Sequence, residues 1–401
     1  MFKSVRGWLQ GFKGRQLSQE QFDSARERLL QAAPVPVFWL FGKTGSGKTS
    51  IIKYLTGAQE AEIGGGFRPC TKFSQRYAFP SADSPLLEFL DTRGVGESRY
   101  DPAEDIAAAD ETAHLMIVTA RMADHALNPV LQPLQTIKKA KPERPVILVL
   151  TCLHELYPQK QHPKPDPFES EEDNGATRLD QLPESLRRSL EEQSRRFSGL
   201  VDEIVPVDLT KPAEGFEEPN FGGERLKAAL VRRLPDAYRQ TFLTMTDVMD
   251  SLKDLHEQRA MPYVLSASTM AASAAAVPVP WIDIPVVIGV QSDLIRRLSA
   301  LYGQAFDAQQ FLQIAGAVGG RLALRQALRE TLKFIPGVGQ AANAALAFAA
   351  TYALGRACCW YYGEKLMGHA PTREELQAVM KDQTAAAREL WKKHKDQGES
   401  A

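Results

Sequence analysis

Short apolar runs alternate with amphipathic stretches over the first 235 residues or so. The runs are rich in Val, Ile, Leu and Phe and are bounded by polar or glycine-rich positions, which is typical of buried β-strands. Strands that alternate with helices predict an α/β fold with a mainly parallel sheet, covered on both faces, and a ligand at the carboxyl ends of the strands. The predicted strands are 35–41, 76–79, 86–90, 114–120, 145–151 and 203–207, and the predicted helices are 49–55, 128–140, 183–196 and 223–234.

The pattern changes to helix throughout from about residue 236, which predicts a C-terminal all-α domain over 236–401 after an α/β domain over 34–235. Two stretches, 260–282 and 334–355, carry no charge and are long enough by count to span a bilayer. The first contains three prolines and several serines, and the second is rich in Ala and Gly, so neither resembles a typical membrane span. A hairpin buried in a soluble helical bundle and a hairpin inserted in a membrane both remain open.

Residues 1–33 form a separate N-terminal segment with a basic amphipathic pattern. Lys and Arg lie away from an apolar helical face, which suits either an anionic membrane surface or docking on one of the two domains. That apolar face is made by Phe2, Val5, Trp8, Leu9 and Phe12. A polar, proline-rich insertion at about 157–182 interrupts the α/β domain and is expected to stay outside its core.

Composition narrows the functional classes. A formal net charge of −1 argues against nucleic acid as a partner. The 4 cysteines show no disulfide-framework or zinc spacing, which favours a reducing cytoplasmic compartment.

The strongest chemical motif follows the first predicted strand. Its glycines allow backbone N–H groups to surround phosphate oxygens, Lys48 can reach the β- and γ-phosphates, and Thr49 can ligate Mg²⁺. A glycine-rich surface turn has no need of Lys48 and Thr49 together. The motif predicts a nucleoside-triphosphate site made of Gly42, Lys43, Thr44, Gly45, Ser46, Gly47, Lys48, Thr49 and, at the start of the helix, Ser50.

A second motif, Asp91-Thr92-Arg93-Gly94, stands where another apolar run ends. Asp91 can hold Mg²⁺ through water, and the Gly94 N–H can approach the γ-phosphate, so that loss of this phosphate releases the loop.

With these two motifs and Thr151 at family-like spacings, residues 34–235 resemble the translation-factor-related P-loop GTPases, including Era-like, septin-like and immunity-related members. The resemblance implies GTP and GDP as ligands, Mg²⁺ as cofactor, and Thr71 as the switch threonine that closes over the metal. Thr49, Thr71 and Asp91 are then the expected metal ligands. Septin-like and immunity-related members pair across the nucleotide face, which leaves a homodimer open.

Val95 stands where Ras-like members carry a water-orienting glutamine, and a valine cannot hydrogen-bond a water. We therefore expect slow intrinsic hydrolysis with Lys48, Thr71 and Arg93 as the catalytic candidates. Stabilisation by Arg93, by a partner or by a second copy of the chain stays open, as does a structural salt bridge for Arg93.

The base-reading segment also departs from the family. Thr151 matches, whereas Cys152 replaces the usual lysine and His154 the usual aspartate. Either His154 or, with a one-residue shift, Glu155 could contact the base. The resemblance favours guanine and leaves adenine open.

Segments at 279–285, 334–339 and 351–355 look like the helical domain of the YcjF family, over about 260–370. That domain has no settled activity and accompanies GTPases and membrane-associated proteins. The prediction is a GTP-binding, slowly hydrolysing switch that couples nucleotide state to a helical effector domain. The alternatives are a dynamin-like or immunity-GTPase-like membrane-remodelling machine and an ATP-dependent P-loop enzyme. The expected location is cytoplasmic, with peripheral or integral membrane association open.

Overall fold

The computed structural model describes residues 33–58, 63, 68–69, 74–92, 95, 102–110, 112–157, 161–169, 179–210, 214–252, 254–276, 283–304, 338–369 and 371–400. They fall into two compact units. The α/β unit comprises Val35–Ala82 and Leu87–Phe242, and the helical unit comprises Asp83–Leu86 and Leu243–Ser400. The amphipathic N-terminal pattern of residues 1–32 lies outside the described residues.

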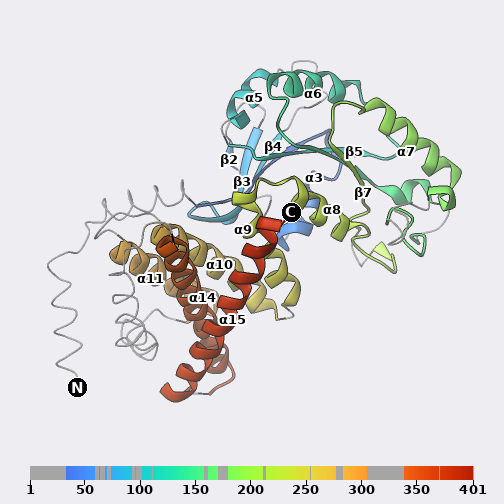
Figure 1. The fold of residues 1–401 in the computed structure, drawn as a ribbon. Coiled ribbons are helices and arrows are strands. Elements are labelled where there is room, and N and C mark those ends of the chain that lie inside the picture. The colour runs from blue at the N-terminus through green and yellow to red at the C-terminus, as the bar shows by residue number, and fades with distance from the viewer. Residues whose placement is uncertain are drawn as a thin grey trace. The chain divides into compact units, whose positions relative to one another are not determined.

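The α/β unit is built on one sheet, whose seven described strands have the order β2-β3-β4-β1-β5-β6-β7 (Figure 1). The central strand β1 runs parallel to β4 on one side and to β5 on the other. Chain order thus reverses at β1, and in open α/β sheets the ligand crevice lies at such a point. The strands are β1 (Val37–Phe41), β2 (Arg68–Pro69), β3 (Ser74–Ser81), β4 (Ser84–Thr92), β5 (Leu115–Arg121), β6 (Val146–Thr151) and β7 (Glu203–Pro206).

Helices cover both faces of this sheet, with α5, α6 and α7 on one face and α3 and α8 on the other (Figure 1). All residues of β1 are buried, and its side chains alternate between two cores. Trp39 packs on the α6 and α7 side, and its indole N–H donates to Thr92 Oγ1 at 2.8 Å. Phe38 points to the opposite face, where its ring lies 5.8 Å from that of Phe242. The helices are α3 (Lys48–Thr56), α5 (Pro102–Asp110), α6 (Asn128–Ala140), α7 (Glu184–Arg196) and α8 (Gly223–Arg233).

The predicted fold class is confirmed, with local corrections. The two-residue strand β2 was not predicted, because Arg68–Pro69 gives no apolar signal. The sequence after the second motif also predicts a helix near 105–112, whereas the observed helix α5 begins earlier, at Pro102, and ends at Asp110. Strand β4 continues to Thr92, so Asp91 lies within the strand rather than after it.

The expectation that the 157–182 insertion stays outside the core is wrong for part of it. Phe168 is 9% exposed and belongs to the core on the α6 and α7 side. His162 is buried and stacks on Phe221 with ring centroids 4.3 Å apart. Asp166 forms an ion pair with Arg225 of α8 at 2.5 Å. These three contacts fix the segment, although its composition alone is too polar to predict a core.

The helical unit contains α10 (Leu255–Ala276), α11 (Asp283–Leu301), α14 (Val338–Leu366) and α15 (Arg373–Ser400), while α9 (Asp236–Ser251) contributes its residues from 243 on. Helices α10 and α14 lie close together: a Cβ atom on Gly355 would come within 2.6 Å of Val264 Cγ1. An ion pair at 3.1 Å joins Arg356 to Glu257. Among the described residues no helix is both long enough and apolar enough to cross a membrane.

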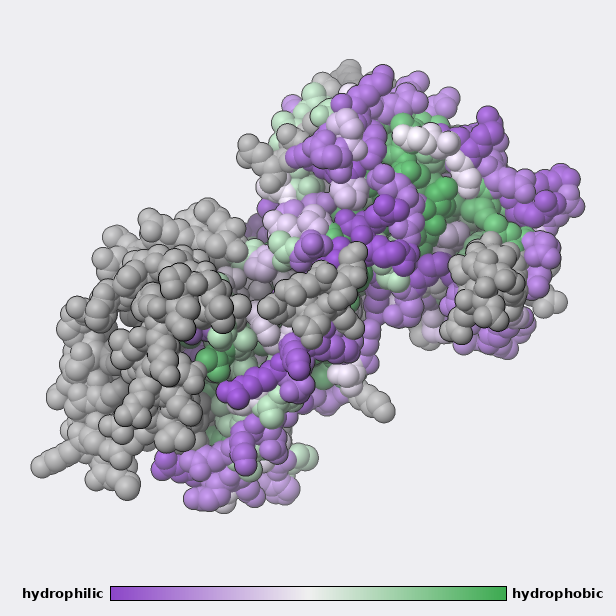
Figure 2. All heavy atoms as spheres, viewed as in Figure 1, coloured by the Kyte–Doolittle hydropathy of each residue, from purple (hydrophilic) through white to green (hydrophobic). Residues whose placement is uncertain are grey.

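The outer surface of the α/β unit is hydrophilic where α7 is exposed (Figure 2). Four arginines and three glutamates of α7 form ion pairs within the helix. The buried side of α7 carries Leu186, Ser189 and Gln193. Its polar buried residues therefore need partners inside the unit.

Candidate functional site

The loop between β1 and α3 has backbone geometry that requires glycine. Gly45 and Gly47 have φ angles of 76° and 93°, in the left-handed region. At Gly42 the restriction is space, because a Cβ atom would lie 2.3 Å from Thr119 Oγ1 of β5. The loop therefore keeps its backbone close to β5.

Threonines near the ends of β5 and β6 form hydrogen bonds with the loop. Ser46 Oγ lies 2.6 Å from Thr119 Oγ1 at the end of β5 and donates to Lys43 O at 2.7 Å. Thr151 Oγ1, at the end of β6, donates to Ser46 O at 3.0 Å. The hydroxyl of Thr151, a predicted nucleotide contact, is thus directed at the loop backbone.

Lys48 is buried, and its ammonium group folds back to the backbone carbonyls at the start of the loop. Its Nζ donates to Gly42 O at 2.8 Å and to Lys43 O at 3.0 Å. The same Nζ lies 3.9 Å from Oδ1 of Asp91, which is 6% exposed. The two predicted motifs therefore meet at the carboxyl ends of β1 and β4.

The N-terminus of α3 is directed into this site. Its N-cap is Gly47, and no side chain caps the helix. The first N–H groups of a helix have no partner within it, and together with the helix dipole they favour an anion. Thr44, Gly45, Thr49 and Ser50 are exposed around this end.

The oxygen donors present fit a hard divalent cation. Thr49 offers a hydroxyl and Asp91 a carboxylate, which are Mg²⁺ ligands when substrate phosphates and water complete the shell. No group of three or more His, Cys, Asp or Glu side chains with metal-binding geometry occurs in the described part of the chain. Thr71, Arg93 and Gly94 lie outside the described residues.

Next to the loop is an open cleft of about 360 Å³ lined by charged side chains. Lys43 Nζ pairs with Asp124 Oδ2 at 2.7 Å, and Arg121 pairs with Glu155. Partial burial would raise the pKa of Asp124, but bonds from Lys43 and the Ala126 N–H, with the charges of Lys43 and Arg121, lower it overall. The other lining residues are Thr44, Ser46 and Ala123.

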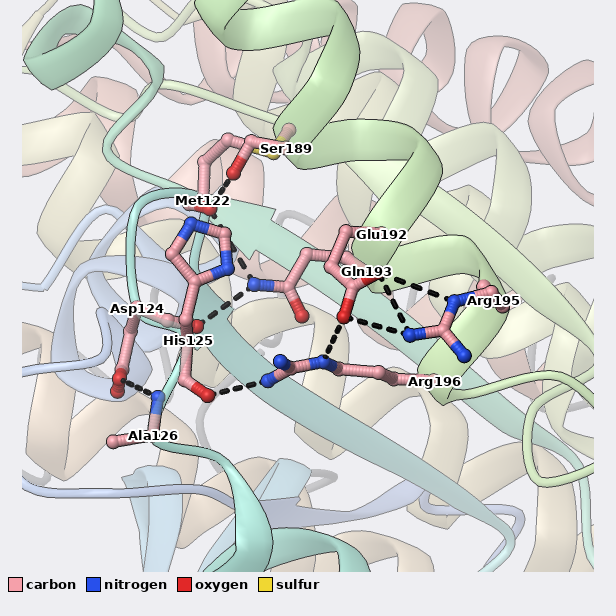
Figure 3. A network of polar contacts seen from close by, with 9 residues as sticks. All are labelled: Met122, Asp124, His125, Ala126, Ser189, Glu192, Gln193, Arg195 and Arg196. Carbon is pink, nitrogen blue, oxygen red and sulfur yellow. Dashed lines mark hydrogen bonds and ion pairs between the residues drawn. The ribbon is translucent and has the colours of Figure 1, made fainter.

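Helix α7 holds the segment that carries Asp124 (Figure 3). Ser189 Oγ donates to Met122 O at 2.6 Å, and Gln193 Nε2 donates to Asp124 O at 2.8 Å. Arg196 donates to His125 O. The buried polar residues of α7 thus fix the loop after β5, and through Asp124 this loop contacts the β1–α3 loop.

The segment after β6 turns sharply at Cys152, whose φ is 58°, into the 3₁₀ helix η2 (Leu153–Leu156). His154 donates its backbone N–H to Asp208 Oδ2 at 2.8 Å, and its Nδ1 lies 2.8 Å from Asp208 Oδ1. Asp208 lies in the segment 207–211, which resembles the final base-contact loop of these GTPases only weakly, and the sequence did not predict its contact with His154. Glu155, the other candidate base contact, is turned toward Arg121.

Val95 is 6% exposed and belongs to the same core as Trp39. Its side chain is packed in this core.

Residues 37–152 match the family described as 50S ribosome-binding GTPase. This region is a GTPase domain. Residues 244–389 match a second family, described as domain of unknown function (DUF697), so the resemblance to a YcjF-like helical domain is confirmed. The chain thus joins a guanine-nucleotide-binding GTPase domain to a DUF697 domain.

One curated relative is "Magnetosome membrane protein 22" of Magnetospirillum gryphiswaldense, 35% identical over 108 residues. The match covers 25% of this chain and 53% of that protein, so the chain spans about half the length of this relative.

Among solved structures, the bacterial selenocysteine-specific elongation factor EF-Sec is similar at 20% identity and a TM-score of 0.29, over 56% of this chain and 30% of that chain. A mutant of S. thermophilus NFeoB bound to GMPPNP is similar at 14% identity and a TM-score of 0.29, over 67% of this chain and 92% of that chain. The family assignment of the GTPase domain rests on the sequence match.

Proposed function

We propose that this protein is a GTP-dependent switch that hydrolyses GTP slowly and transmits its nucleotide state to the DUF697 domain. The observation that carries the proposal is the meeting of Lys48 and Asp91, with Nζ and Oδ1 3.9 Å apart, beside the uncapped start of α3. A phosphate chain needs a cation, backbone donors and a metal-holding carboxylate together, and these groups supply them.

Each residue of the loop has a role in this proposal. The backbone N–H groups of residues 43–49 surround the β-phosphate, and Lys48 moves its ammonium from Gly42 O and Lys43 O toward the β- and γ-oxygens. Thr49, Asp91 and Thr71 would hold Mg²⁺. When bound, the metal neutralises charge that develops on the phosphate oxygens.

Slow hydrolysis follows from the position of Val95. A buried valine neither orients nor deprotonates a water, so attack on the γ-phosphate lacks the usual positioning group. Arg93, two positions before Val95 in the sequence, is one candidate to supply positive charge to the transition state, and a partner or a second copy of the chain is the alternative. Such an arginine contributes several orders of magnitude in rate where it acts.

The switch itself is assigned to Thr71 and Gly94. Both contact the γ-phosphate in this proposal, and hydrolysis releases their loops. The helical effector then responds to the released loops, either directly or through a partner.

Membrane association is a further part of the proposal. It is supported by the basic apolar pattern of residues 2–15 and by the similarity to a magnetosome membrane protein. Flotation with anionic liposomes of the full chain and of a chain that begins at Ser18 tests it. Equal flotation of the two would remove the N-terminal segment as an anchor.

Hydrolysis tests the central proposal. Purified protein with GTP and Mg²⁺ should release phosphate at about 10⁻³ s⁻¹ or less, and Lys48→Ala should abolish the reaction. Arg93→Ala should slow it at least about tenfold if Arg93 acts in the same chain, with Arg76→Ala, whose partner is Glu88, as the control. Specific activity that rises with protein concentration would support pairing across the nucleotide face. Hydrolysis of ATP at an equal or higher rate would contradict the proposal.

A further inference from the structure

In the GTPase domain His154 stands where the family has the aspartate that reads guanine, and the buried carboxylate of Asp208 is hydrogen-bonded to this histidine. Asp208 follows β7 and its side chain is 2% exposed, while that of His154 is 35% exposed. Both oxygens of Asp208 are engaged by His154: Oδ2 accepts from the backbone N–H at 2.8 Å, and Oδ1 lies 2.8 Å from Nδ1. The carboxylate of Asp208 thus holds both the backbone N–H and the imidazole ring of His154.

This arrangement fixes the tautomer of His154. An ionised carboxylate only accepts hydrogen bonds, so Nδ1 carries the proton that it donates to Asp208. In the neutral imidazole, Nε2 then has a lone pair and acts as an acceptor. Nε2 forms no hydrogen bond to any of the described residues.

The orientation of the ring is fixed as well. The ring of Phe216 lies edge-on to that of His154 with centroids 5.4 Å apart. Phe216 stacks in turn on His162, with centroids 5.4 Å apart, and His162 stacks on Phe221. The part of the 157–182 insertion that packs on the domain therefore supports the base-reading loop.

The other acceptor in this loop is already paired. Glu155 forms an ion pair with Arg121 at the edge of the charged cleft. Its carboxylate is therefore less suited than Nε2 of His154 to accept from a base.

We propose that His154, positioned by Asp208, reads the purine by accepting one hydrogen bond from the N1–H of guanine at Nε2. The inference rests on the proposed function, because it takes the nucleotide to be bound at the neighbouring phosphate loop. Guanine presents N1–H as a donor, whereas N1 of adenine is an acceptor and would face the lone pair of Nε2. His154 is the specificity-determining residue, and Asp208 is a positioning residue.

A single acceptor and a carboxylate should differ in the relative affinities they give for GTP and ITP. A carboxylate accepts from both N1–H and the 2-amino group of guanine, whereas one imidazole nitrogen accepts from N1–H alone. Hypoxanthine keeps N1–H and lacks the amino group. The protein should therefore bind ITP within about threefold of GTP and bind both at least about tenfold more tightly than ATP.

Calorimetry of the full chain with Mg²⁺ and GTP, ITP or ATP provides the test. His154→Ala should lower the GTP-to-ATP affinity ratio at least about tenfold. Asp208→Asn should do the same, because an amide can donate to Nδ1 and so place the proton on Nε2. Asp202→Asn is the matched control: it alters a carboxylate just before β7, which accepts from Val146 N and pairs with Lys138. Its ratio should equal that of the unmodified chain.

The outcomes distinguish the base-reading inference about His154 from the proposed function. If the unmodified chain prefers GTP and His154→Ala keeps that preference, the base-reading inference is wrong while the proposed function stands. GTP affinity more than about thirtyfold above ITP affinity would also contradict a single acceptor. Equal losses for all three nucleotides in Asp208→Asn would assign Asp208 a structural role only. Absence of binding by any of the three nucleotides in the unmodified chain would instead contradict the proposed function.

Discussion

Thr151 at the end of β6 donates its hydroxyl to the backbone carbonyl of Ser46 at 3.0 Å, and so ties the base-reading side of the domain to the phosphate-binding loop. Both groups are buried. A buried carbonyl that loses its donor cannot turn to water, so this bond matters for the shape of the loop.

Thr151→Val should therefore destabilise the chain by about 1–2 kcal/mol and weaken GTP binding. Valine keeps the volume and removes the donor. Thr151→Ser keeps the hydroxyl and should retain most of the binding, which makes it the control. Urea unfolding and nucleotide titration measure the two effects, and equal behaviour of both variants would show that the hydrogen bond is unimportant.

Two glycines of the loop should respond differently to the same change. In Gly42→Ala the new methyl group would lie 2.3 Å from Thr119 Oγ1 and 2.4 Å from Thr119 O, so the strand or the loop must move. At Gly45 a Cβ meets nothing within 4 Å, and the cost is the left-handed φ of 76°. We expect a loss of about 1–2 kcal/mol for Gly45→Ala and a clearly larger loss for Gly42→Ala. Similar unfolding free energies for the two variants would contradict the close approach of the loop to β5.

The ion pair between Lys43 and Asp124 should make a modest, salt-dependent contribution. Its side chains are 27% and 23% exposed, so its worth is about 0.5–1 kcal/mol. Asp124→Asn should weaken GTP binding about two- to fivefold at low salt and less at about 0.5 M salt. Glu184→Gln, which removes the exposed partner of Arg188 on α7, is the control and should leave binding unchanged. A loss that grows with salt would exclude an electrostatic origin.

His114 should make the stability of the α/β unit depend on pH. Burial lowers the pKa of His114 to about 4, and its Nδ1 accepts from the Val37 N–H at 3.0 Å, which requires the neutral ring. The unfolded chain binds the proton near pH 6.5, so the contribution is complete above that pH and is lost as the pH falls toward 4. We expect about 1–2 kcal/mol over this window, because the ring is only partly buried.

The substitution His114→Asn tests this effect. The amide oxygen of asparagine can still accept from Val37 and does not titrate. The unfolding free energy of the variant should therefore fall less between pH 7 and pH 5 than that of the unmodified chain. Parallel pH dependence of the two proteins would remove His114 as the cause.

Much of the GTPase domain could be predicted, because its signals are local. β1 is a short apolar run followed at once by its glycine loop, and α6 was predicted with the bounds that the structure has. Lys48 begins α3 after the loop that follows β1, and Asp91 lies next to the last residue of β4. Parallel strands bring their carboxyl ends to one edge of the sheet. Their approach to 3.9 Å follows from topology.

Other features depend on partners that are distant in the sequence. The role of Asp208 depends on its contact with His154, and the residues around Asp208 in the sequence do not indicate that contact. Phe168 lies in a polar insertion, yet the guanidinium of Arg225 stacks over its ring at 5.1 Å and draws the segment onto the domain. Such pairings depend on the tertiary packing, which residue pattern alone does not encode.

Calorimetric titration of the full chain with GTP, GDP and ATP in the presence of Mg²⁺, for the unmodified protein and for Lys48→Ala, tests the central claim most directly. The account predicts tight binding of both guanine nucleotides, binding of ATP at least about tenfold weaker, and loss of GTP binding in the variant. ATP affinity equal to or greater than GTP affinity, or GTP affinity unchanged by Lys48→Ala, would contradict it.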